Sequence, residues 1–384
     1  MRYLTILGAT GSIGTQTLEL VADYPDDFQI HALVARNNVD LLIKQARKFT
    51  PKHVVIGNDD QYDLLRAALA GSDIELHAGD TAIMEIAAHQ VDICVAAITG
   101  AAGIGPVYHA LQAGNDVALA NKEALVCAGH LLINLAASTK AKLLPLDSEH
   151  NALFQLLEGR KMADVSRLTL TASGGPFRSL PLAKMRSITK AQALNHPNWV
   201  MGQKISIDSA TMMNKGLELI EAHHLFQLGN DGLDVLVHPQ SIVHGIIEMV
   251  DGAQMAAFGE TTMRGAIAHC LGFPKRLKGA VAPLDLARIG TLAFEAPDAV
   301  KFPALALARH ALDCGQAACI ALNAANEIAV DAFLKDRIEF HHIYHYCAQQ
   351  VAAATKGSPP IITDIHDVLA LDQEYRATTN AFIY

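Results

Sequence analysis

Residues 7–14 read Leu7-Gly8-Ala9-Thr10-Gly11-Ser12-Ile13-Gly14, and this turn decides the fold of the 384-residue chain. An apolar run over residues 3–7 precedes it, and an amphipathic segment begins at Ser12. Glycines between a strand and a helix let the backbone approach a pyrophosphate, to which the new helix offers free N–H groups and its positive dipole end. The spacing is G-x-x-G-x-x-G and not the commoner G-x-G-x-x-G, so a tight turn that binds no nucleotide is the alternative.

The first 147 residues alternate short apolar runs with amphipathic stretches. We expect strands at 3–7, 29–34, 53–56, 91–98, 117–120 and 143–146, and helices that begin at Ser12, Asp40, Pro106 and Glu123. This alternation is typical of βαβ units, which build a parallel sheet. The sequence therefore predicts an α/β protein in which residues 1–147 form an N-terminal doubly wound, NADPH-binding domain.

The pattern changes twice beyond residue 147. We expect a central α+β catalytic domain over 148–275 on a mostly antiparallel sheet, with a helix at 152–157 and strands at 166–172, 204–207, 235–237, 242–249 and 254–258. The proline-rich residues 276–303 are typical of a linker arm. Residues 304–384 predict a C-terminal α-helical bundle, with helices at 304–313, 317–334, 339–354 and 363–377.

The bulk composition disfavours several classes of protein. Its 39 acidic and 30 basic side chains give a net charge of −9, so we expect no nucleic acid partner. The six cysteines include no C-x-x-C pair, which favours a reduced, cytoplasmic protein. No stretch reads as apolar enough for long enough to span a bilayer, and we expect no membrane partner.

The end of the second strand bears on the choice of cofactor. An NAD enzyme usually has an acid there for the ribose 2′-hydroxyl, but this chain reads Val34-Ala35-Arg36-Asn37-Asn38. Arg36 can pair with a 2′-phosphate, which favours NADP over NAD. A solvated surface arginine is the alternative.

Three acidic residues could hold a metal ion. Asp147 and Glu149 are two residues apart, so on extended chain they would point the same way, and Glu218 could complete a set of oxygen ligands. Such ligands suit Mg²⁺ or Mn²⁺ and not zinc. Ordinary surface charge is the alternative.

Other polar groups could contact a substrate. Lys122 opens a helix at the carboxyl edge of the sheet, where ligands bind, although Asn121 could simply cap that helix. Hydroxyls, amides, a lysine and glycine N–H groups suit a small phosphate, and they occur in Ser173-Gly174-Gly175-Pro176-Phe177-Arg178, Ser209-Ala210-Thr211 and Asn214-Lys215. Trp199, the single tryptophan, is either a core residue or part of a lid.

Seven segments together resemble the 1-deoxy-D-xylulose 5-phosphate reductoisomerase family over nearly the whole chain. In order they are Gly11-Ser12-Ile13-Gly14, Ala120-Asn121-Lys122-Glu123, Asp147-Ser148-Glu149-His150-Asn151, Ser173-Gly174-Gly175-Pro176-Phe177-Arg178, His196-Pro197-Asn198-Trp199, Asp208-Ser209-Ala210-Thr211-Met212-Met213-Asn214-Lys215-Gly216-Leu217-Glu218 and Leu322-Asn323-Ala324-Ala325-Asn326-Glu327. The resemblance implies an enzyme of the non-mevalonate isoprenoid route that rearranges 1-deoxy-D-xylulose 5-phosphate and reduces it with NADPH to 2-C-methyl-D-erythritol 4-phosphate. It also implies a homodimer, and a mobile loop that closes Trp199 over the phosphorylated sugar.

The resemblance also assigns residues to roles. Asp147, Glu149 and Glu218 would bind Mg²⁺ or Mn²⁺, with Co²⁺ as a further choice, and would form the catalytic set together with Lys122. The substrate would contact Lys122, Ser148, Glu149, Ser173, His196, Trp199, Ser209, Asn214, Lys215 and Glu218. NADPH would contact Thr10, Gly11, Ser12, Ile13, Ala35, Arg36, Asn37, Asn121, Glu123 and Gly202. The family usually has glycine at the position of Ala35, which weakens the argument about the 2′-phosphate.

Two other functions stay open at this point. A semialdehyde or homoserine type dehydrogenase shares a dinucleotide domain followed by an α+β domain. The semialdehyde type needs a nucleophilic cysteine, for which Cys127 in an apolar helix is a poor candidate. A non-catalytic NADP-binding regulator would keep the glycine turn but would not need three placed carboxylates.

Overall fold

A computed structural model describes residues 1–199 and 201–383, and the chain divides into two compact units. Unit 1 contains Met1–Ala124, His130–Ser148 and Met263–Val281. Unit 2 contains Leu125–Gly129, Glu149–Thr262 and Ala282–Tyr384. The chain therefore passes back and forth between the units instead of completing one before the other.

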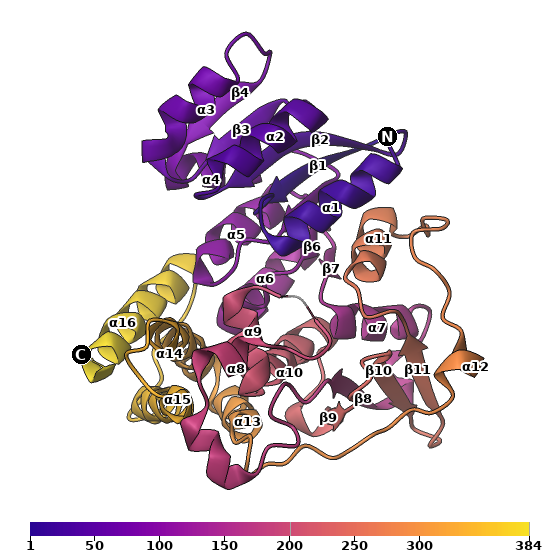
Figure 1. Ribbon diagram of the computed structural model, residues 1–384, viewed down its shortest axis with the longest axis vertical. Helices are drawn as coiled ribbons and strands as arrows, with labels where there is room; N and C mark the ends of the chain where they lie inside the picture. The colour runs from indigo at the N-terminus through magenta and orange to yellow at the C-terminus, as the bar shows by residue number, and fades with distance from the viewer. Residues whose placement is uncertain (200, 384) are drawn as a thin grey trace. The chain divides into compact units, whose positions relative to one another are not determined.

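Unit 1 is built on a seven-stranded sheet with the order β4-β3-β2-β1-β5-β6-β7 (Figure 1). The strands are β1 (Arg2–Leu7), β2 (Phe28–Ala35), β3 (His53–Ile56), β4 (Glu75–Ala78), β5 (Ile93–Ala96), β6 (Asp116–Leu119) and β7 (Leu143–Pro145). Every pairing in it is parallel, and the order reverses between β1 and β5. The prediction of a doubly wound sheet is confirmed, and its reversal point is where such folds bind their ligands.

Helices of unit 1 connect successive strands. They are α1 (Ser12–Asp23), α2 (Val39–Phe49), α3 (Tyr62–Ala68), α4 (Gly79–Ala87), α5 (Ile104–Gln112) and the ends of α6 (Lys122–Thr139). A late segment joins them, because α11 (Arg264–Gly272) packs on α1, with an ion pair between Arg264 and Asp23. Residues 57–90, for which no element was predicted, contain α3, β4 and α4.

Unit 2 contains a four-stranded sheet with the order β11-β10-β8-β9. Its strands are β8 (Val165–Ala172), β9 (Leu233–Val237), β10 (Val243–Met249) and β11 (Gln254–Phe258). The pairs β10–β11 and β10–β8 are antiparallel and β8–β9 is parallel, so the predicted, mostly antiparallel sheet is confirmed. The helices α7 (Ser148–Leu157), α8 (Lys190–Leu194), α9 (Gln203–Ala210) and α10 (Met213–Phe226) accompany it.

Two local predictions in this region are wrong. The strand expected at 204–207 is the helix α9, because its buried residues Ile207 and Ala210 are three apart and pack as a helical face. The helix expected at 152 begins at Ser148, so Glu149 lies in the first turn of α7 and not on extended chain. The prediction that the side chains of Asp147 and Glu149 point the same way, as they would on extended chain, therefore does not apply.

The C-terminal helices confirm the predicted bundle. They are α13 (Ala304–Cys314), α14 (Gln316–Leu334), α15 (Phe340–Ala354) and α16 (Ile365–Ile383), and α14 contacts the other three. The segment before them holds the short helix α12 (Leu286–Ile289) and a bridge from Glu295 to Val237. Within unit 2, Asn326 of α14 bonds to Asp208 of α9.

One helix corrects the expectation about membranes. By length and composition α14 could cross a bilayer, contrary to the prediction that no stretch is long and apolar enough. However, 78% of its apolar window is buried inside the protein, as in the core helix of a folded domain.

Candidate active site

The glycine turn after β1 leaves no room for a side chain at Gly8 or Gly14. A Cβ at Gly8 would lie 2.5 Å from the carbonyl oxygen of Ala97, and one at Gly14 would lie 2.3 Å from that of Gly8. Gln45 Nε2 stabilises the turn by donating to the carbonyl oxygen of Ala9 (2.9 Å). Gly11 is the N-cap of α1 and has no side chain that could accept from the helix, so the first N–H groups of α1 are available to an anion.

The residues predicted to line the nucleotide lie around this turn and at the end of β2. Gly11 and Ser12 are exposed, while Thr10 and Ile13 are half-buried. Arg36 and Asn37 are exposed just beyond β2, whereas Ala35 is buried as its last residue. Arg36 is not simply solvated, because its Nη1 donates to Asp80 Oδ1 in α4 (2.7 Å).

Asn121 caps helix α6, as the alternative reading of this motif expected. Its Oδ1 accepts from the N–H of Ala124 (2.8 Å), and its Nδ2 donates to the carbonyl oxygens of Ile98 (2.6 Å) and Gly100 (2.9 Å). Nδ2 also lies 3.1 Å from Glu123 Oε2. Asn121 therefore shapes the loop after β5, and its own side chain is already engaged.

Lys122 and Asp147 form a largely buried pair in unit 1. Lys122 Nζ donates to Asp147 Oδ2 at 2.6 Å, with side chains 9% and 12% exposed. They follow β6 and β7, the two outermost strands on one side of the sheet. Both thus lie at its carboxyl edge, where the switch-point rule expects chemistry.

Helix α10 gathers a second charged cluster in unit 2. Lys215 Nζ donates to Glu149 Oε1 (2.9 Å) and contacts Glu218 Oε2. Asn214 Nδ2 donates to Glu218 Oε1 (2.5 Å). Helical spacing explains the grouping on α10, since residues three and four apart share one face.

These oxygens fit a hard divalent cation. Glu149 and Glu218 offer ligand oxygens within 4.8 Å of each other. Asp147 precedes Glu149 by only two residues, so their Cα atoms can be no more than about 7 Å apart. A set made of carboxylates suits Mg²⁺ or Mn²⁺.

A buried pair, His150 and Glu221, supports this cluster and was not predicted from the sequence. His150 donates from Nε2 to the carbonyl oxygen of Glu218 (2.9 Å), and its Nδ1 lies 3.3 Å from Glu221 Oε2. Both side chains are at most 1% exposed. His150 follows Glu149 directly, and that adjacency was the one signal in the sequence that pointed to such a role.

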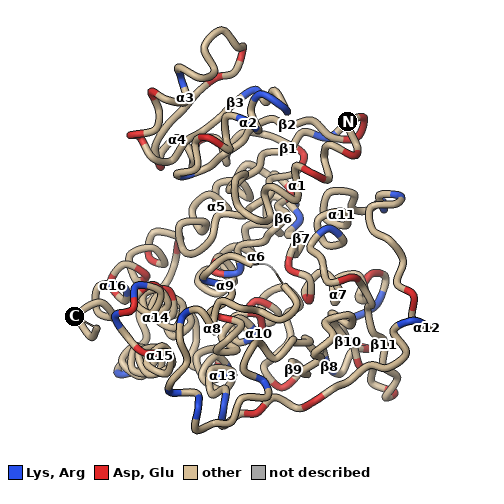
Figure 2. The backbone as a smooth tube through the Cα atoms, viewed as in Figure 1, with Lys and Arg blue, Asp and Glu red and all other residues tan. Residues whose placement is uncertain are grey.

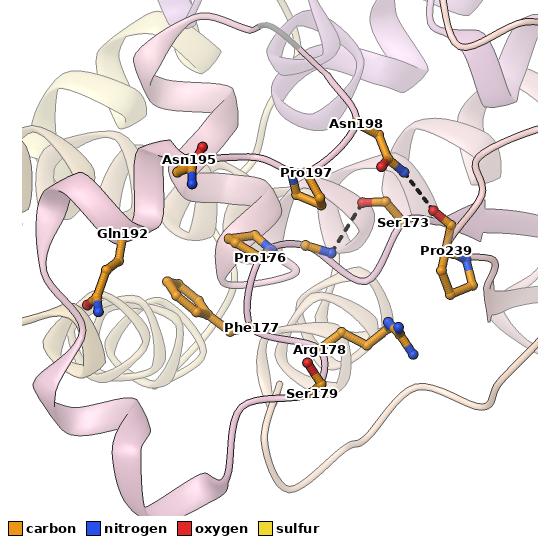
Figure 3. A pocket seen from close by; sticks show the side chains of 11 residues that line it. Ser173, Pro176, Phe177, Arg178, Ser179, Gln192, Asn195, Pro197, Asn198 and Pro239 are labelled. Atoms are coloured by element: carbon orange, nitrogen blue, oxygen red, sulfur yellow. Dashed lines mark hydrogen bonds between the residues drawn. The ribbon is translucent and has the colours of Figure 1, made fainter.

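A cavity of about 560 Å³ opens in unit 2 beside the predicted phosphate segments (Figure 3). The side chains of Ser173, Pro176, Asn198 and Pro239 point toward it, and Gly175 contributes backbone. Gly174 and Gly175 have φ of +82° and +67°, in the left-handed region that favours glycine. A Cβ at Gly175 would lie 2.6 Å from the carbonyl oxygen of Ser209, so α9 ends against this loop.

His196 connects the cavity wall to the loop that carries Trp199. Its Nδ1 accepts from the backbone N–H groups of Asn198 (3.2 Å) and Trp199 (3.0 Å). A neutral ring then carries its proton on Nε2, which donates to Ser173 Oγ (3.0 Å). Burial lowers the pKa of His196 from 6.5, which favours this neutral form.

The structure thus brings the predicted residues together in four groups. In unit 1 these are the glycine turn with the end of β2, and Lys122 with Asp147. In unit 2 they are Glu149 with Asn214, Lys215 and Glu218, and Ser173 with His196 and the backbone of Trp199. Two predicted residues fall outside these groups. Ser148 is half-buried at the start of α7, and Gly202 is the exposed N-cap of α9.

Comparisons with known proteins agree along the chain. Family models match residues 4–129 (1-deoxy-D-xylulose 5-phosphate reductoisomerase), residues 143–226 (the C-terminal domain of that enzyme) and residues 258–378 (DXP reductoisomerase C-terminal domain). A 1-deoxy-D-xylulose 5-phosphate reductoisomerase of Rhodospirillum centenum is 50% identical over 98% of this chain and 93% of its own length. That of Rhodopseudomonas palustris strain BisB18 is 48% identical over 100% of this chain and 94% of its own.

Solved structures are equally similar. A crystal structure of DOX-P reductoisomerase in complex with NADPH, fosmidomycin and magnesium superposes with a TM-score of 0.94 at 43% identity, covering 100% of this chain and 98% of that one. The 1-deoxy-D-xylulose 5-phosphate reductoisomerase of Zymomonas mobilis in complex with NADPH gives 0.92 at 44% identity, covering 100% and 99%. From its sequence, its fold and these matches, the chain belongs to the 1-deoxy-D-xylulose 5-phosphate reductoisomerase family.

Proposed function

We propose that the protein rearranges 1-deoxy-D-xylulose 5-phosphate and reduces the product with NADPH to 2-C-methyl-D-erythritol 4-phosphate, in the presence of Mg²⁺ or Mn²⁺. The observation that carries this proposal is the pair of carboxylates of Glu149 and Glu218, both contacted by Lys215, in a chain of this family. A semialdehyde dehydrogenase is disfavoured because Cys127 is fully buried. A regulator that binds NADP alone would gain nothing from acids held so close together.

Asp147, Glu149 and Glu218 would hold the divalent cation. When bound, the cation supplies Lewis-acid polarisation of the ketone and a neighbouring hydroxyl of the sugar. Asn214 fixes the side chain of Glu218, and His150 fixes its backbone, so this ligand keeps its orientation. Lys215 is placed to balance acid charge and to contact the substrate, and Lys122 can do the same beside Asp147.

The nucleotide would lie on the glycine turn, where NADPH supplies the hydride. Thr10, Gly11, Ser12 and Ile13 present backbone N–H groups to its pyrophosphate. Arg36 and Asn37 would contact the 2′-phosphate side, next to Ala35. Asn121 and Glu123 would shape the loop around the nicotinamide, and Gly202 would contact the cofactor by its backbone.

The cavity in unit 2 would hold the phosphate of the sugar. Ser173 Oγ accepts from both His196 Nε2 and the Gly175 N–H (3.2 Å), so its own hydroxyl proton is left to donate to a phosphate oxygen. Ser209, Asn214 and Lys215 would add donors, and Ser148 would contact the sugar. Trp199 would close over the substrate, since His196 binds its backbone.

The test is an assay of NADPH oxidation with 1-deoxy-D-xylulose 5-phosphate, with the product identified by NMR. Glu218→Gln should lower kcat by about 100-fold or more, because a metal ligand is lost, while NADPH affinity stays within a factor of about two. Glu374→Gln, at an exposed acid of α16, is the matched control and should behave as wild type. Full turnover after exhaustive chelation would refute the proposed function.

Three further assignments belong to this proposal. We infer a homodimer, to be checked by sedimentation equilibrium, and a cytoplasmic enzyme without nucleic acid or membrane partners. Figure 2 agrees with the charge argument, since along the described backbone basic and acidic residues are interspersed. The division into an NADPH-binding domain (1–147), a catalytic domain (148–275), a linker arm (276–303) and a helical domain (304–384) is to be checked by limited proteolysis.

A further inference from the structure

Four histidines and a glutamate gather on the outer strands of the unit 1 sheet, away from the glycine turn. His31 belongs to β2, His53 opens β3, Glu75 and His77 belong to β4, and His89 follows α4. The strands β3 and β4 begin here, whereas the glycine turn follows the carboxyl end of β1. No role in the proposed reaction falls on any of these five residues.

Their ring nitrogens lie at the separations of metal ligands. His31 Nε2 is 3.3 Å from His89 Nδ1, and one nitrogen from each of His31, His53 and His89 lies within 4.8 Å of the others. Two ligands at about 2.0–2.1 Å from a tetrahedral zinc ion are about 3.3–3.4 Å apart. The pair His31–His89 therefore already has the length of a tetrahedron edge.

His53 supplies a nitrogen that nothing else uses. Its side chain is only 4% exposed, and its Nε2 has no hydrogen-bond partner among the residues that the structure describes. Such a buried polar atom costs stability unless it binds something. Its Nδ1, by contrast, lies 3.2 Å from His77 Nε2 and 3.4 Å from Glu75 Oε2. Metal-bound histidines commonly donate their second ring N–H to such partners.

Backbone features position two of these histidines, His31 and His89. The pairing of β1 with β2 skips a residue at His31, since Leu4 pairs with Ile30 and Thr5 with Ala32. A bulge of this kind redirects the side chain of the extra residue. On the other side, buried Asn115 donates to the carbonyl oxygen of His89 (2.9 Å) and accepts from the N–H of Val91 (3.0 Å).

We propose that His31, His53 and His89 form a second metal site, specific for a divalent transition-metal ion such as Zn²⁺. His53 Nε2, His31 Nε2 and His89 Nδ1 are the ligand atoms, and water completes the coordination. Glu75 and His77 accept the proton on His53 Nδ1 and fix its ring. The ion ties β2, β3 and the segment after α4 together.

The chemistry of the cluster separates it from the carboxylate site. Neutral imidazoles prefer zinc and similar ions, whereas carboxylates prefer Mg²⁺ and Mn²⁺.

Zinc titration of the full-length, tag-free protein tests the proposal, with excess Mg²⁺ present to fill the carboxylate site. Competition with a chromophoric chelator should reveal one tight Zn²⁺ site, and Zn²⁺ should raise Tm, because a ligand that binds the folded state stabilises it. Co²⁺ in place of Zn²⁺ should give the intense visible bands of tetrahedral nitrogen ligation. Absence of a tight site in the wild type would overturn the proposal.

Variants assign the ligands. His89→Gln and His31→Gln, at half-buried positions, should each weaken Zn²⁺ binding by about 100-fold or more and abolish the rise in Tm, while Glu75→Gln should weaken it about 10-fold. NADPH oxidation with Mg²⁺ should stay unchanged in all three, which separates failure here from failure of the proposed function. The control is the double variant His341→Gln/His342→Gln, which removes two histidines of a separate cluster whose ligand atoms, with that of Glu339, also lie within 4.8 Å of one another. Loss of the tight site in this control, or its survival in His89→Gln, would overturn the assignment.

Discussion

Arg36 already has a partner, and this makes its proposed contact with a 2′-phosphate a matter of exchange. Arg36 and Asp80 are 58% and 67% exposed, and an exposed ion pair contributes only about 0–1 kcal/mol. A phosphate that carries about two negative charges forms stronger, charge-assisted hydrogen bonds with a guanidinium and would displace the carboxylate.

We therefore predict opposite effects at the two ends of this pair. Arg36→Ala should raise KM for NADPH about 10-fold or more and leave KM for NADH nearly unchanged. Asp80→Asn should lower KM for NADPH, because the 2′-phosphate then no longer competes with the Asp80 carboxylate for Arg36. Steady-state kinetics with both cofactors decide the point. If Arg36→Ala affects NADPH and NADH equally, Arg36 does not discriminate between them.

His196 should make substrate binding depend on pH. Burial lowers its pKa below 6.5, so it is neutral at pH 7, and the stability it contributes is full above pH 6.5 and lost as pH falls through the lowered pKa. Protonation of Nδ1 would break its bonds to the N–H groups of Asn198 and Trp199. We predict that KM for the sugar phosphate rises on this acid limb. His196→Gln, which does not titrate, should show a smaller rise, and an identical profile would contradict the role.

At the level of elements, α9 shows where sequence patterns fail. Residues 204–207 read Lys-Ile-Ser-Ile, which alternates as a strand does, and four residues cannot distinguish the two periods. The fold decides for a helix, because Asp208 is buried and is matched by Asn326 of α14 and by Lys204 one turn earlier. That match lies 118 residues away in sequence, so no local pattern could predict it.

Loss of this contact should destabilise unit 2. Asn326 is fully buried and donates to Asp208 Oδ1 at 2.8 Å. Asn326→Leu would remove a donor from a buried carboxylate, and we predict a loss of about 1.5–3 kcal/mol in the free energy of unfolding. Urea denaturation measures it, with Gln373→Leu at an exposed position of α16 as the control. Equal stability of the two variants would show that Lys204 alone satisfies Asp208.

The loop after α8 carries Trp199, and its proposed motion can be tested. Trp199 is half-buried and is the single tryptophan of the chain, so its emission reports on this loop alone. We predict a saturable change in its fluorescence when a phosphonate analogue of the substrate binds with Mg²⁺. An emission that is unchanged at saturating ligand would show that Trp199 does not close over the substrate.

For the whole molecule, the sequence predicts the sheets and helices better than the side-chain contacts between distant segments. Glycine spacing and buried runs such as 53–56 suffice for the parallel sheet of unit 1, because each is a local signal. The motif order also predicted Glu149, Lys215 and Glu218 as site residues, but not that one lysine contacts both acids, nor that His150 supports Glu218. Likewise, the prolines of residues 273–283 indicated a connecting segment and gave no sign that Met263–Val281 belongs to unit 1.

Thiol reactivity should report the integrity of the whole fold. Five of the six cysteines are buried, and Cys314 is exposed. Burial raises the pKa of Cys94 and Cys319 to about 12, which suppresses their reactive thiolates. We predict that a thiol reagent labels one cysteine rapidly in the native protein and all six after denaturation. Rapid native labelling of two or more would mean that a core segment opens.

The packing of α11 on α1 has a consequence for how the protein is made. The ion pair between Arg264 and Asp23 joins residues 241 apart. At a synthesis rate of about 5–20 residues per second, the ribosome needs roughly 12–50 s to travel from one to the other. Throughout that interval the nascent first helix is without its cover, and the apolar surface destined for α11 is open to chaperones or to other newborn chains. Slowed translation anywhere between the two residues would prolong this exposure and lower the yield of folded protein without changing a single amino acid.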